Sequence, residues 1–335
     1  MSSRSSPLVI TAALALAACS PRPVLDNPDV EGLRALGDQV QSERLIGLVT
    51  DLTQVHRTDT PFDCKIWPYA LPARFCNLSR TKIQDLMVAR FTELGLQVRR
   101  QELTSEQYST ANVIADIPGT THPEEVVLVG AHFDAFWDGA DDNSSGIAAM
   151  LELARVLSQR RFDRTIRFVG FDLEEFGSIG SSRYVDAQSP NEKLVLALVF
   201  DCLGYYSTEP GSQRSIPGLP SPDRGDFLLA ISNDATASLA SELYALSREM
   251  ETARVIPLVA PADGAVPLAE PLLRSDHTSF WLKGHPALFV SDTALYRNPN
   301  YHTTRDTVET LHPELYGKTV KLMASAIGYW AGGPR

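Results

Sequence analysis

Apolar residues recur at spacings of three to five positions from Val30 to His56, and this stretch contains no proline. Such spacing places apolar side chains on one side of a helix, so the stretch is predicted to be helical. Arg80–Leu94 is also predicted to be a helix, because it is followed by Gly95 and glycine commonly terminates helices. Strands are predicted at Leu96–Leu103 and Asn112–Ile117. The N-terminal part is therefore expected to form helices that precede two strands.

The rest of the chain alternates between apolar runs and amphipathic stretches. The predicted strands are Glu125–His132, Arg164–Leu173, Leu194–Cys202, Asp226–Ser232 and Ala287–Ser291. The predicted helices are Ser145–Leu157, Gly180–Ala187, Ala235–Glu249 and Glu314–Trp330, the last of which opens at Pro313. This alternation predicts a single α/β domain over residues 30–335, with a mostly parallel central sheet and helices on both faces.

Two polar stretches rich in proline and glycine interrupt the alternation, Tyr205–Gly225 and Pro257–Arg274. Each directly follows a predicted strand. Because α/β proteins place their ligands at the carboxyl ends of parallel strands, both stretches are expected to border a ligand pocket.

The N-terminus predicts export. Its first six residues carry one positive charge, at Arg4, and the apolar run Pro7–Ala18 that follows is too short to span a bilayer. Residues 1–18 are therefore expected to be a signal peptide. The four residues that end at Cys19 resemble the bacterial lipobox, which implies a lipidated cysteine followed by a linker over residues 19–29. The expected product is a periplasmic or cell-surface lipoprotein, held at the outer membrane in a Gram-negative organism and touching the membrane only through its lipid.

Composition narrows the classes of partner. The net charge is −11, which argues against nucleic acid and against anionic membrane surfaces, because both favour basic patches. An acidic protein is compatible with a substrate that carries a positive amine. The sequence has no CxxC pair, so a cysteine zinc site is not supported. In an oxidising compartment Cys64 and Cys76 are expected to form a disulfide, with two buried thiols as the alternative, and Cys202 is expected to be a core thiol.

Acidic and imidazole side chains gather near the ends of the predicted strands. His132 and Asp134 are two positions apart on an extended segment and therefore face the same side. This places Asp134 to orient the imidazole of His132 while the other ring nitrogen binds a metal. Asp142 lies in the turn before a helix, where an aspartate is commonly an N-cap. The neighbouring acid, amide and hydroxyl groups exceed what one cap needs.

Three further segments add to this set. Glu174 and Glu175 follow an apolar strand, where a buried acid pair favours a counter-charge such as a metal. Asp201 ends another apolar strand, and His302 lies in a polar turn. Each alone is explained by a cap, a helix start or a surface ion pair. Together these nitrogen and oxygen donors suit zinc, and three ligand carboxylates with one hydroxide would balance two divalent cations.

These segments, in this order, resemble the co-catalytic zinc aminopeptidases, a family that includes secreted bacterial leucyl aminopeptidases. Glutaminyl cyclases and transferrin-receptor-like proteins are similar in fold, which is of the phosphorylase/hydrolase-like type. The resemblance extends from about Asn112 to the end of the chain. The matching stretches are Gly130–Asp134, Gly139–Gly146, Glu174–Gly177, Asp201 and Tyr301–Thr304.

The resemblance implies two zinc ions. The implied ligands are His132 and Asp201 for one ion, Glu175 and His302 for the other, and Asp142 bridging both. It also implies Glu174 as the general base, Tyr301 as a group that polarises the substrate carbonyl, Asp134 as the partner of His132, and His277 as a residue that lines the pocket.

The implied reaction is zinc-dependent hydrolysis of the N-terminal peptide bond of a peptide with a free N-terminus, by a monomeric enzyme. Two alternatives remain open. A glutaminyl cyclase would use the same fold with one zinc, and a non-catalytic binding module would hold none. Metal content distinguishes the three.

Overall fold

The computed structural model describes residues 25–57, 77–104, 109–216, 221–260, 264 and 267–334. The expected signal peptide, the lipidated Cys19, most of the linker and the expected Cys64–Cys76 disulfide lie outside the described residues. Within the described ranges, no helix combines the length and the apolar character needed to cross a membrane.

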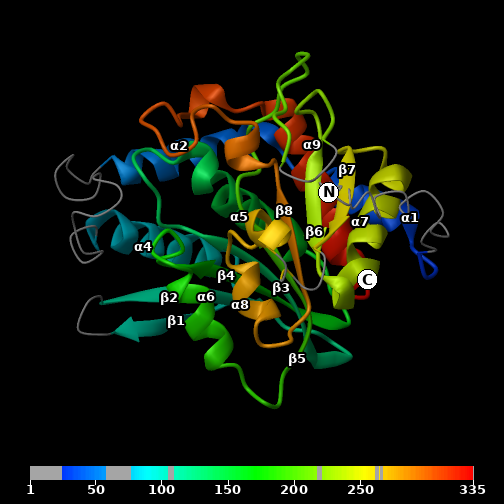
Figure 1. Ribbon diagram of the computed structural model, residues 1–335. Helices are drawn as coiled ribbons and strands as arrows, with labels where there is room; N and C mark the ends of the chain where they lie inside the picture. The colour runs from blue at the N-terminus through cyan, green and yellow to red at the C-terminus, as the bar shows by residue number, and fades with distance from the viewer. Residues whose placement is uncertain are drawn as a thin grey trace, which may run out of the picture.

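Eight strands of the described chain form one central sheet in the order β1-β2-β4-β3-β5-β8-β6-β7 (Figure 1). The strands are β1 (Gln97–Thr104), β2 (Ser109–Ile117), β3 (His122–His132), β4 (Arg164–Phe171), β5 (Lys193–Phe200), β6 (Leu228–Ser232), β7 (Val255–Val259) and β8 (Ala287–Ser291). The four middle strands, β4, β3, β5 and β8, are parallel. β2 and β6 run antiparallel to this middle part, and β1 and β7 complete the two edges. The predicted α/β fold is confirmed, with a parallel centre and mixed flanks.

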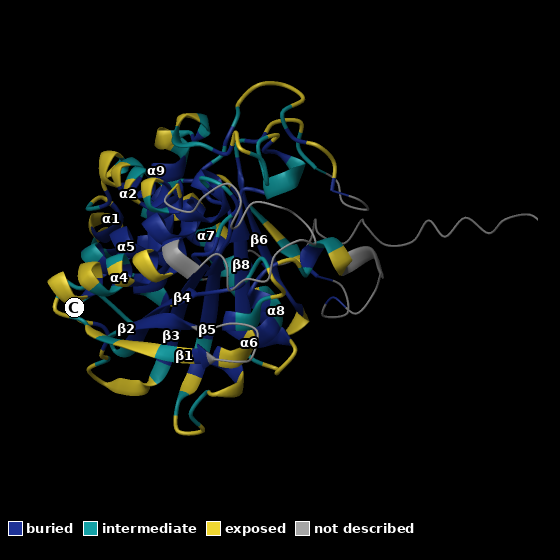
Figure 2. Cartoon of the chain, turned by 90° about the vertical axis from the view of Figure 1, so that its left-hand side faces the viewer, coloured by how far each residue is buried: buried dark blue, intermediate teal, exposed yellow. Residues whose placement is uncertain are grey.

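Helices cover both faces of the sheet, and the inner strands between them are almost entirely buried, whereas the edge strands β1 and β7 are partly exposed (Figure 2). One layer contains α1 (Val30–Gly37), α2 (Ser42–His56), α4 (Asn77–Glu93), α5 (Gly146–Leu157), α7 (Ala237–Met250) and α9 (Pro313–Trp330). The other contains α6 (Ile179–Asp186) and α8 (His277–Trp281). The apolar side chains of alternate strand residues divide between these two cores.

This alternation determines where the ends of β3 and β5 point. Alternate residues of each strand pack toward α6 and α8, and His132 and Asp201 continue these alternate positions at the ends of β3 and β5. The register pairs Ala131 with Phe200, one position earlier. The strand periodicity and the parallel register therefore bring the His132 imidazole and the Asp201 carboxylate to the same face and the same end of the sheet.

The prediction of one continuous helix over Val30–His56 is wrong, because the chain breaks between α1 and α2. The buried carboxylate of Glu152 accepts the backbone N–H of Gln41 at 3.0 Å. Arg155 donates to the backbone carbonyl of Gln39 at 2.6 Å. These contacts from α5 replace the hydrogen bonds that a continuous helix would make.

The expectation that Pro257–Arg274 is a loop throughout is also wrong, because its first residues complete β7. Proline is tolerated there because β7 is the last strand of the sheet and Pro257 need not donate to a further neighbour. β6 runs antiparallel to β8 and parallel to β7, so the carboxyl ends of β6 and β7 lie at the opposite end of the sheet from Asp201.

Candidate metal centre

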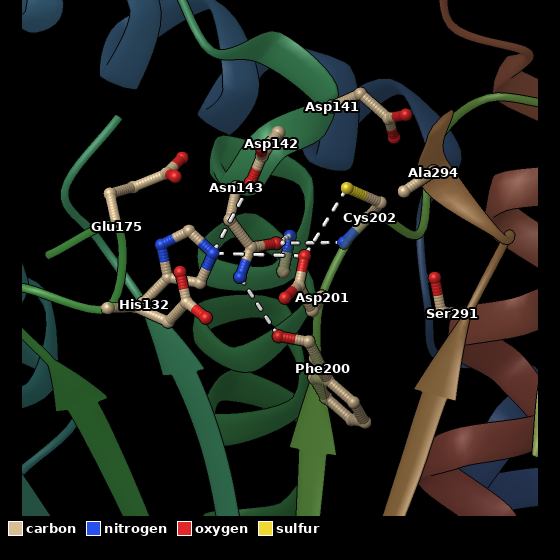
Figure 3. A network of polar contacts seen from close by, with 12 residues as sticks. His132, Asp141, Asp142, Asn143, Glu175, Phe200, Asp201, Cys202, Ser291 and Ala294 are labelled. Carbon is tan, nitrogen blue, oxygen red and sulfur yellow. Dashed lines mark hydrogen bonds and ion pairs between the residues drawn. The ribbon is translucent and has the colours of Figure 1, made fainter. Parts of the chain in front are cut away.

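Three predicted ligands converge beyond the carboxyl ends of β3 and β5 (Figure 3). His132 ends β3, Asp201 follows β5, and Asp142 lies within the short segment η2 (Ala140–Ser145), at a point where the backbone is not helical. Nε2 of His132 lies 3.3 Å from Oδ1 of Asp142 and 3.8 Å from Oδ1 of Asp201. One donor atom from each residue lies within 4.8 Å of the others, which is close enough for all three to ligate one ion.

A second group of donors shares Asp142. Nε2 of His302 lies 2.8 Å from Oδ2 of Asp142 and 3.2 Å from Oε1 of Glu175. Asp142 therefore directs one carboxylate oxygen toward His132 and the other toward His302. The five residues predicted to bind metal form two adjacent groups joined by one carboxylate.

The donor atoms fit a bound cation. Among the residues that the structure describes, the buried Nε2 of His132 and the buried Oε1 of Glu175 make no hydrogen bond. A buried polar atom without such a partner is costly, and a metal ion would supply the missing interaction. Imidazole nitrogens and carboxylate oxygens are ligands that zinc accepts.

The charges of the site also favour a cation. Burial and the nearby Asp142 raise the pKa of Glu175 to about 8. Burial, together with the negative charges of Asp201 and Glu175, raises the pKa of Glu174 well above its usual value. Crowded carboxylates of this kind are stabilised in their charged form by a divalent ion.

The pKa values of the two predicted histidine ligands are also raised, which favours the protonated form of each ring. Burial lowers the pKa of His132, but the nearby carboxylates of Asp134, Asp142 and Asp201 outweigh it and hold that pKa well above the usual range. For His302, burial is likewise outweighed by Asp142 and Glu175, and the pKa rises to about 10. Since a metal binds the neutral imidazole, protons and metal ions compete for these two rings.

Asp134 contacts both the imidazole of His132 and the loop that carries Glu174 and Glu175, which we call the acidic loop. Oδ1 of Asp134 lies 3.5 Å from Nδ1 of His132, and the same nitrogen lies 3.0 Å from the backbone carbonyl oxygen of Asp134. The carboxylate also accepts the backbone N–H groups of Glu174 and Glu175 at 3.0 and 3.2 Å. One side chain therefore orients a predicted ligand and holds the loop that carries the predicted base.

A cavity opens beside Asp201 and Tyr301. Its walls are mainly apolar and include Ile216, Leu229, Ile231, Leu272, Phe289 and Leu295. Ile216 comes from the first polar stretch predicted to border a pocket and Leu272 from the second, so both contribute to the wall. The ring of Tyr301 stacks on that of His302 with 3.9 Å between centroids.

His277 lies behind this wall and is not one of the residues that line the cavity. Its ring is fully buried and stacks on Phe289 with 4.5 Å between centroids. Nε2 lies 2.9 Å from the backbone carbonyl oxygen of Leu272, which accepts a hydrogen bond from it. Burial lowers the pKa of His277 to about 4, so the ring is neutral at pH 7.

Two buried aspartates that support the site had no predicted role. Asp306 accepts the backbone N–H groups of Asp141 and Asp142 at 3.0 and 3.1 Å. Asp292 follows β8 and accepts the backbone N–H groups of Tyr205 and Ala294, both at 2.8 Å. Asp292 carries the same signal as Asp201, an acid at the end of a buried strand, and could have been found by it.

Comparison with known proteins identifies a family that covers most of the sheet and all the predicted metal ligands. Residues 112–327 match the family described as peptidase family M28. The chain is 30% identical over 246 residues to the uncharacterized protein YfbL of Escherichia coli, covering 69% of this chain and 74% of YfbL.

The similar solved structures include two aminopeptidases. The LapA aminopeptidase of Legionella pneumophila has a TM-score of 0.67 and 19% identity, and the match covers 94% of this chain and 79% of LapA. BSAP, a zinc aminopeptidase from Bacillus subtilis, has a TM-score of 0.52 and 27% identity, with 66% of this chain and 50% of BSAP covered. The likeness to LapA establishes the fold.

Proposed function

Because the chain belongs to peptidase family M28, we propose that it is a zinc-dependent aminopeptidase that hydrolyses the N-terminal peptide bond of peptides. The observation that carries the proposal is the pair of donor groups that share Asp142. The zinc aminopeptidase BSAP and the aminopeptidase LapA, both similar to this chain, support the same activity.

The proposal includes two zinc ions per chain. His132 and Asp201 would hold one ion, Glu175 and His302 the other, and the two oxygens of Asp142 would bridge them. Bound zinc supplies a polarised peptide carbonyl and a water that ionises near neutral pH. One carboxylate oxygen of Asp142 faces His132 and the other faces His302. This arrangement supports a pair of ions rather than a single one.

Glu174 is the proposed general base. It accepts a proton from the attacking water and donates that proton to the amine that leaves when the peptide bond breaks. Asp134 holds Glu174 through the backbone hydrogen bond at 3.0 Å. The Tyr301 hydroxyl donates a hydrogen bond to the carbonyl oxygen as negative charge develops on it.

The cavity beside Asp201 is the proposed site for the side chain of the N-terminal residue. Its apolar wall suits an uncharged side chain, while the carboxylates around Asp142 suit the positive α-amine. A peptide with a free N-terminus satisfies both regions. A blocked N-terminus would remove the charge that the carboxylates attract.

The decisive experiment measures hydrolysis of aminoacyl p-nitroanilides by the purified protein, together with its metal content. We expect cleavage that a zinc chelator abolishes and added zinc restores, with no cleavage of N-acetylated substrates. Two zinc equivalents per chain are expected. Chelator-insensitive cleavage would contradict the proposal, one zinc with cyclisation of glutaminyl peptides would favour a cyclase, and a zinc-free inactive protein would favour a binding module.

We also propose that the chain is exported as a monomeric lipoprotein anchored through Cys19. The N-terminal sequence supports this, with its apolar run ending in a lipobox-like cysteine. A Cys19→Ser variant is expected to lose incorporation of radiolabelled palmitate and to leave the membrane fraction. Light scattering on the protein lacking residues 1–19 is expected to give the monomer mass, and a dimer mass would contradict it.

A further inference from the structure

Three aromatic side chains lie beside the second group of metal donors, and we call them the aromatic wall: Phe136, Trp137 and Phe176. The ring of Phe136 lies 6.0 Å from that of Trp137 and 6.4 Å from that of Phe176, centroid to centroid. Phe136 also meets the imidazole of His302 edge-on at 4.9 Å. The wall is therefore continuous with the metal centre through a ligand ring.

The wall leaves apolar surface exposed close to the predicted catalytic groups. Phe136 is buried and Trp137 half-buried, but the side chain of Phe176 is 39% exposed. An exposed large aromatic ring next to a charged site is a candidate contact for a ligand. Phe176 directly follows Glu175, so the position of this ring is tied to that of a metal ligand.

The backbone that presents Phe176 is held in place before any ligand binds. Asp134 accepts the backbone N–H groups of Glu174 and Glu175, and the N–H of Gly177 donates to the carbonyl oxygen of Glu174 at 2.8 Å. Gly177 has a φ of 101°, which glycine adopts readily. A preorganised aromatic surface binds an apolar group with less loss of entropy than a mobile one.

The position of the leaving amine indicates which part of a peptide substrate would reach the aromatic wall. The amine that leaves belongs to the second residue of the substrate, and Glu174 must donate a proton to it. Phe176 is two residues after Glu174 and packs on Phe136, on the His302 side of the site. The cavity for the first residue lies beside Asp201 and Tyr301, and none of the three residues of the aromatic wall lines it.

We infer that the aromatic wall is the binding site for the side chain of the second residue, and that it selects peptides with an aromatic or large apolar residue there. This inference rests on the proposed aminopeptidase function. It adds a specificity determinant, Phe176, that is separate from the metal ligands and from the cavity for the first side chain.

The test compares two substrates that differ only at the second residue, leucyl-phenylalanine amide and leucyl-alanine amide, with the zinc-loaded enzyme. We expect kcat/KM to favour the first by about three- to tenfold, the range of one aromatic contact. In Phe176→Ala this ratio should fall close to one, and in Phe176→Tyr it should be retained. Leu282→Ala, which removes an apolar side chain that is 80% exposed in the segment after α8, should keep the wild-type ratio.

The outcomes separate the two proposals. Cleavage of both amides with the same ratio in wild type and Phe176→Ala would overturn the aromatic wall and leave the aminopeptidase function standing. A wild-type ratio of one would overturn it too. Failure to cleave either amide in the presence of zinc would overturn the proposed function, and the inference with it. Melting temperatures of the variants confirm that a changed ratio does not come from unfolding.

Discussion

The carboxylate of Asp134 accepts a hydrogen bond from the backbone N–H of Glu174 at 3.0 Å. From the sequence, Asp134 was expected only to orient His132, and it does lie 3.5 Å from Nδ1 of that ring. Its second contact, with the loop that carries Glu174, joins the ends of β3 and β4. The predicted base and the predicted ligand are thus positioned by one carboxylate.

Asp134→Asn should impair both functions of this side chain. An amide presents only one acceptor oxygen, and its NH₂ group would face the backbone N–H of Glu174 or Glu175. We expect zinc affinity or kcat/KM to fall about 10- to 100-fold, the usual range for partners of metal ligands. Zinc titration and steady-state kinetics measure the two effects.

A matched control for Asp134→Asn lies four residues further along the same segment. Asp138 pairs with Arg57 at 2.6 Å and makes no contact with the acidic loop in the hydrogen bonds of the described residues. Asp138→Asn should retain zinc affinity and most activity. Equal behaviour of the two variants would show that Asp134 has no special role.

Glu174→Gln should abolish turnover while both zinc ions stay bound. Glutamine has nearly the shape of glutamate but cannot accept the proton of the attacking water. We expect kcat to fall by about 10²- to 10⁴-fold, with unchanged metal content by mass spectrometry. Glu175→Gln is the matched variant and should lose zinc. The reverse pattern would mean that the two roles are exchanged.

The site residues at the strand ends could be predicted, because the signal for them lies in neighbouring residues of the sequence. His132 and Asp201 each follow a continuous apolar run, which is typical of a buried parallel strand, and parallel pairing brings such ends together. The break between α1 and α2 was not predictable, because it depends on Glu152, 111 residues away from Gln41. The continuation of β7 through Pro257 was not predicted, because proline within a strand is compatible only with an edge, and edges are a property of the assembled sheet.

Of the two buried aspartates that support the site, one could be predicted from the sequence and the other could not. Asp292 follows an apolar strand and could be predicted, whereas the function of Asp306 depends on two backbone N–H groups that are 164 and 165 residues away. The aromatic wall also required the structure. Phe136 and Phe176 lie on separate segments, and only the packing of Phe176 on Phe136, and of Phe136 on His302, shows that they belong together.

Asp306→Ala should weaken zinc binding through Asp142. The carboxylate accepts the N–H groups of Asp141 and Asp142, so its removal leaves two buried donors without partners. We expect a loss of about 2–5 kcal/mol in the free energy of unfolding and a lower zinc affinity. Urea denaturation and zinc titration measure both. Asp186→Ala, which removes only a surface pair with Lys283, should change neither, and a zinc affinity unaffected by Asp306→Ala would refute the positioning role.

Gly139→Ala should destabilise the loop that presents Asp142. Gly139 has a φ of 52°, and a Cβ there would lie 2.5 Å from the carbonyl oxygen of Asp142 and 2.5 Å from Cβ of Ala135. Strain of this kind costs about 1–3 kcal/mol, which urea denaturation would measure. Gly47→Ala in α2 is the matched control, because a Cβ there meets no atom within 4 Å. It should raise stability by about 0.5–1 kcal/mol.

His277 should make the stability of the protein fall at acid pH. Its ring is neutral in the folded protein because burial lowers its pKa from 6.5 to about 4. The unfolded chain therefore takes up a proton on this ring below pH 6.5, while the folded protein does not until about pH 4. The stabilisation is complete above pH 6.5 and is lost as pH falls toward 4, by about 3 kcal/mol in total.

The His277 effect is isolated by comparing the wild type with His277→Phe from pH 7 to pH 4. Phenylalanine keeps an aromatic ring against Phe289 but loses the hydrogen bond to Leu272, so the variant should be less stable at pH 7. Because it has no imidazole to protonate, the difference should shrink as pH falls, and differencing removes the titration of all other groups. A constant difference for His277→Phe would mean that this buried ring does not couple protonation to folding.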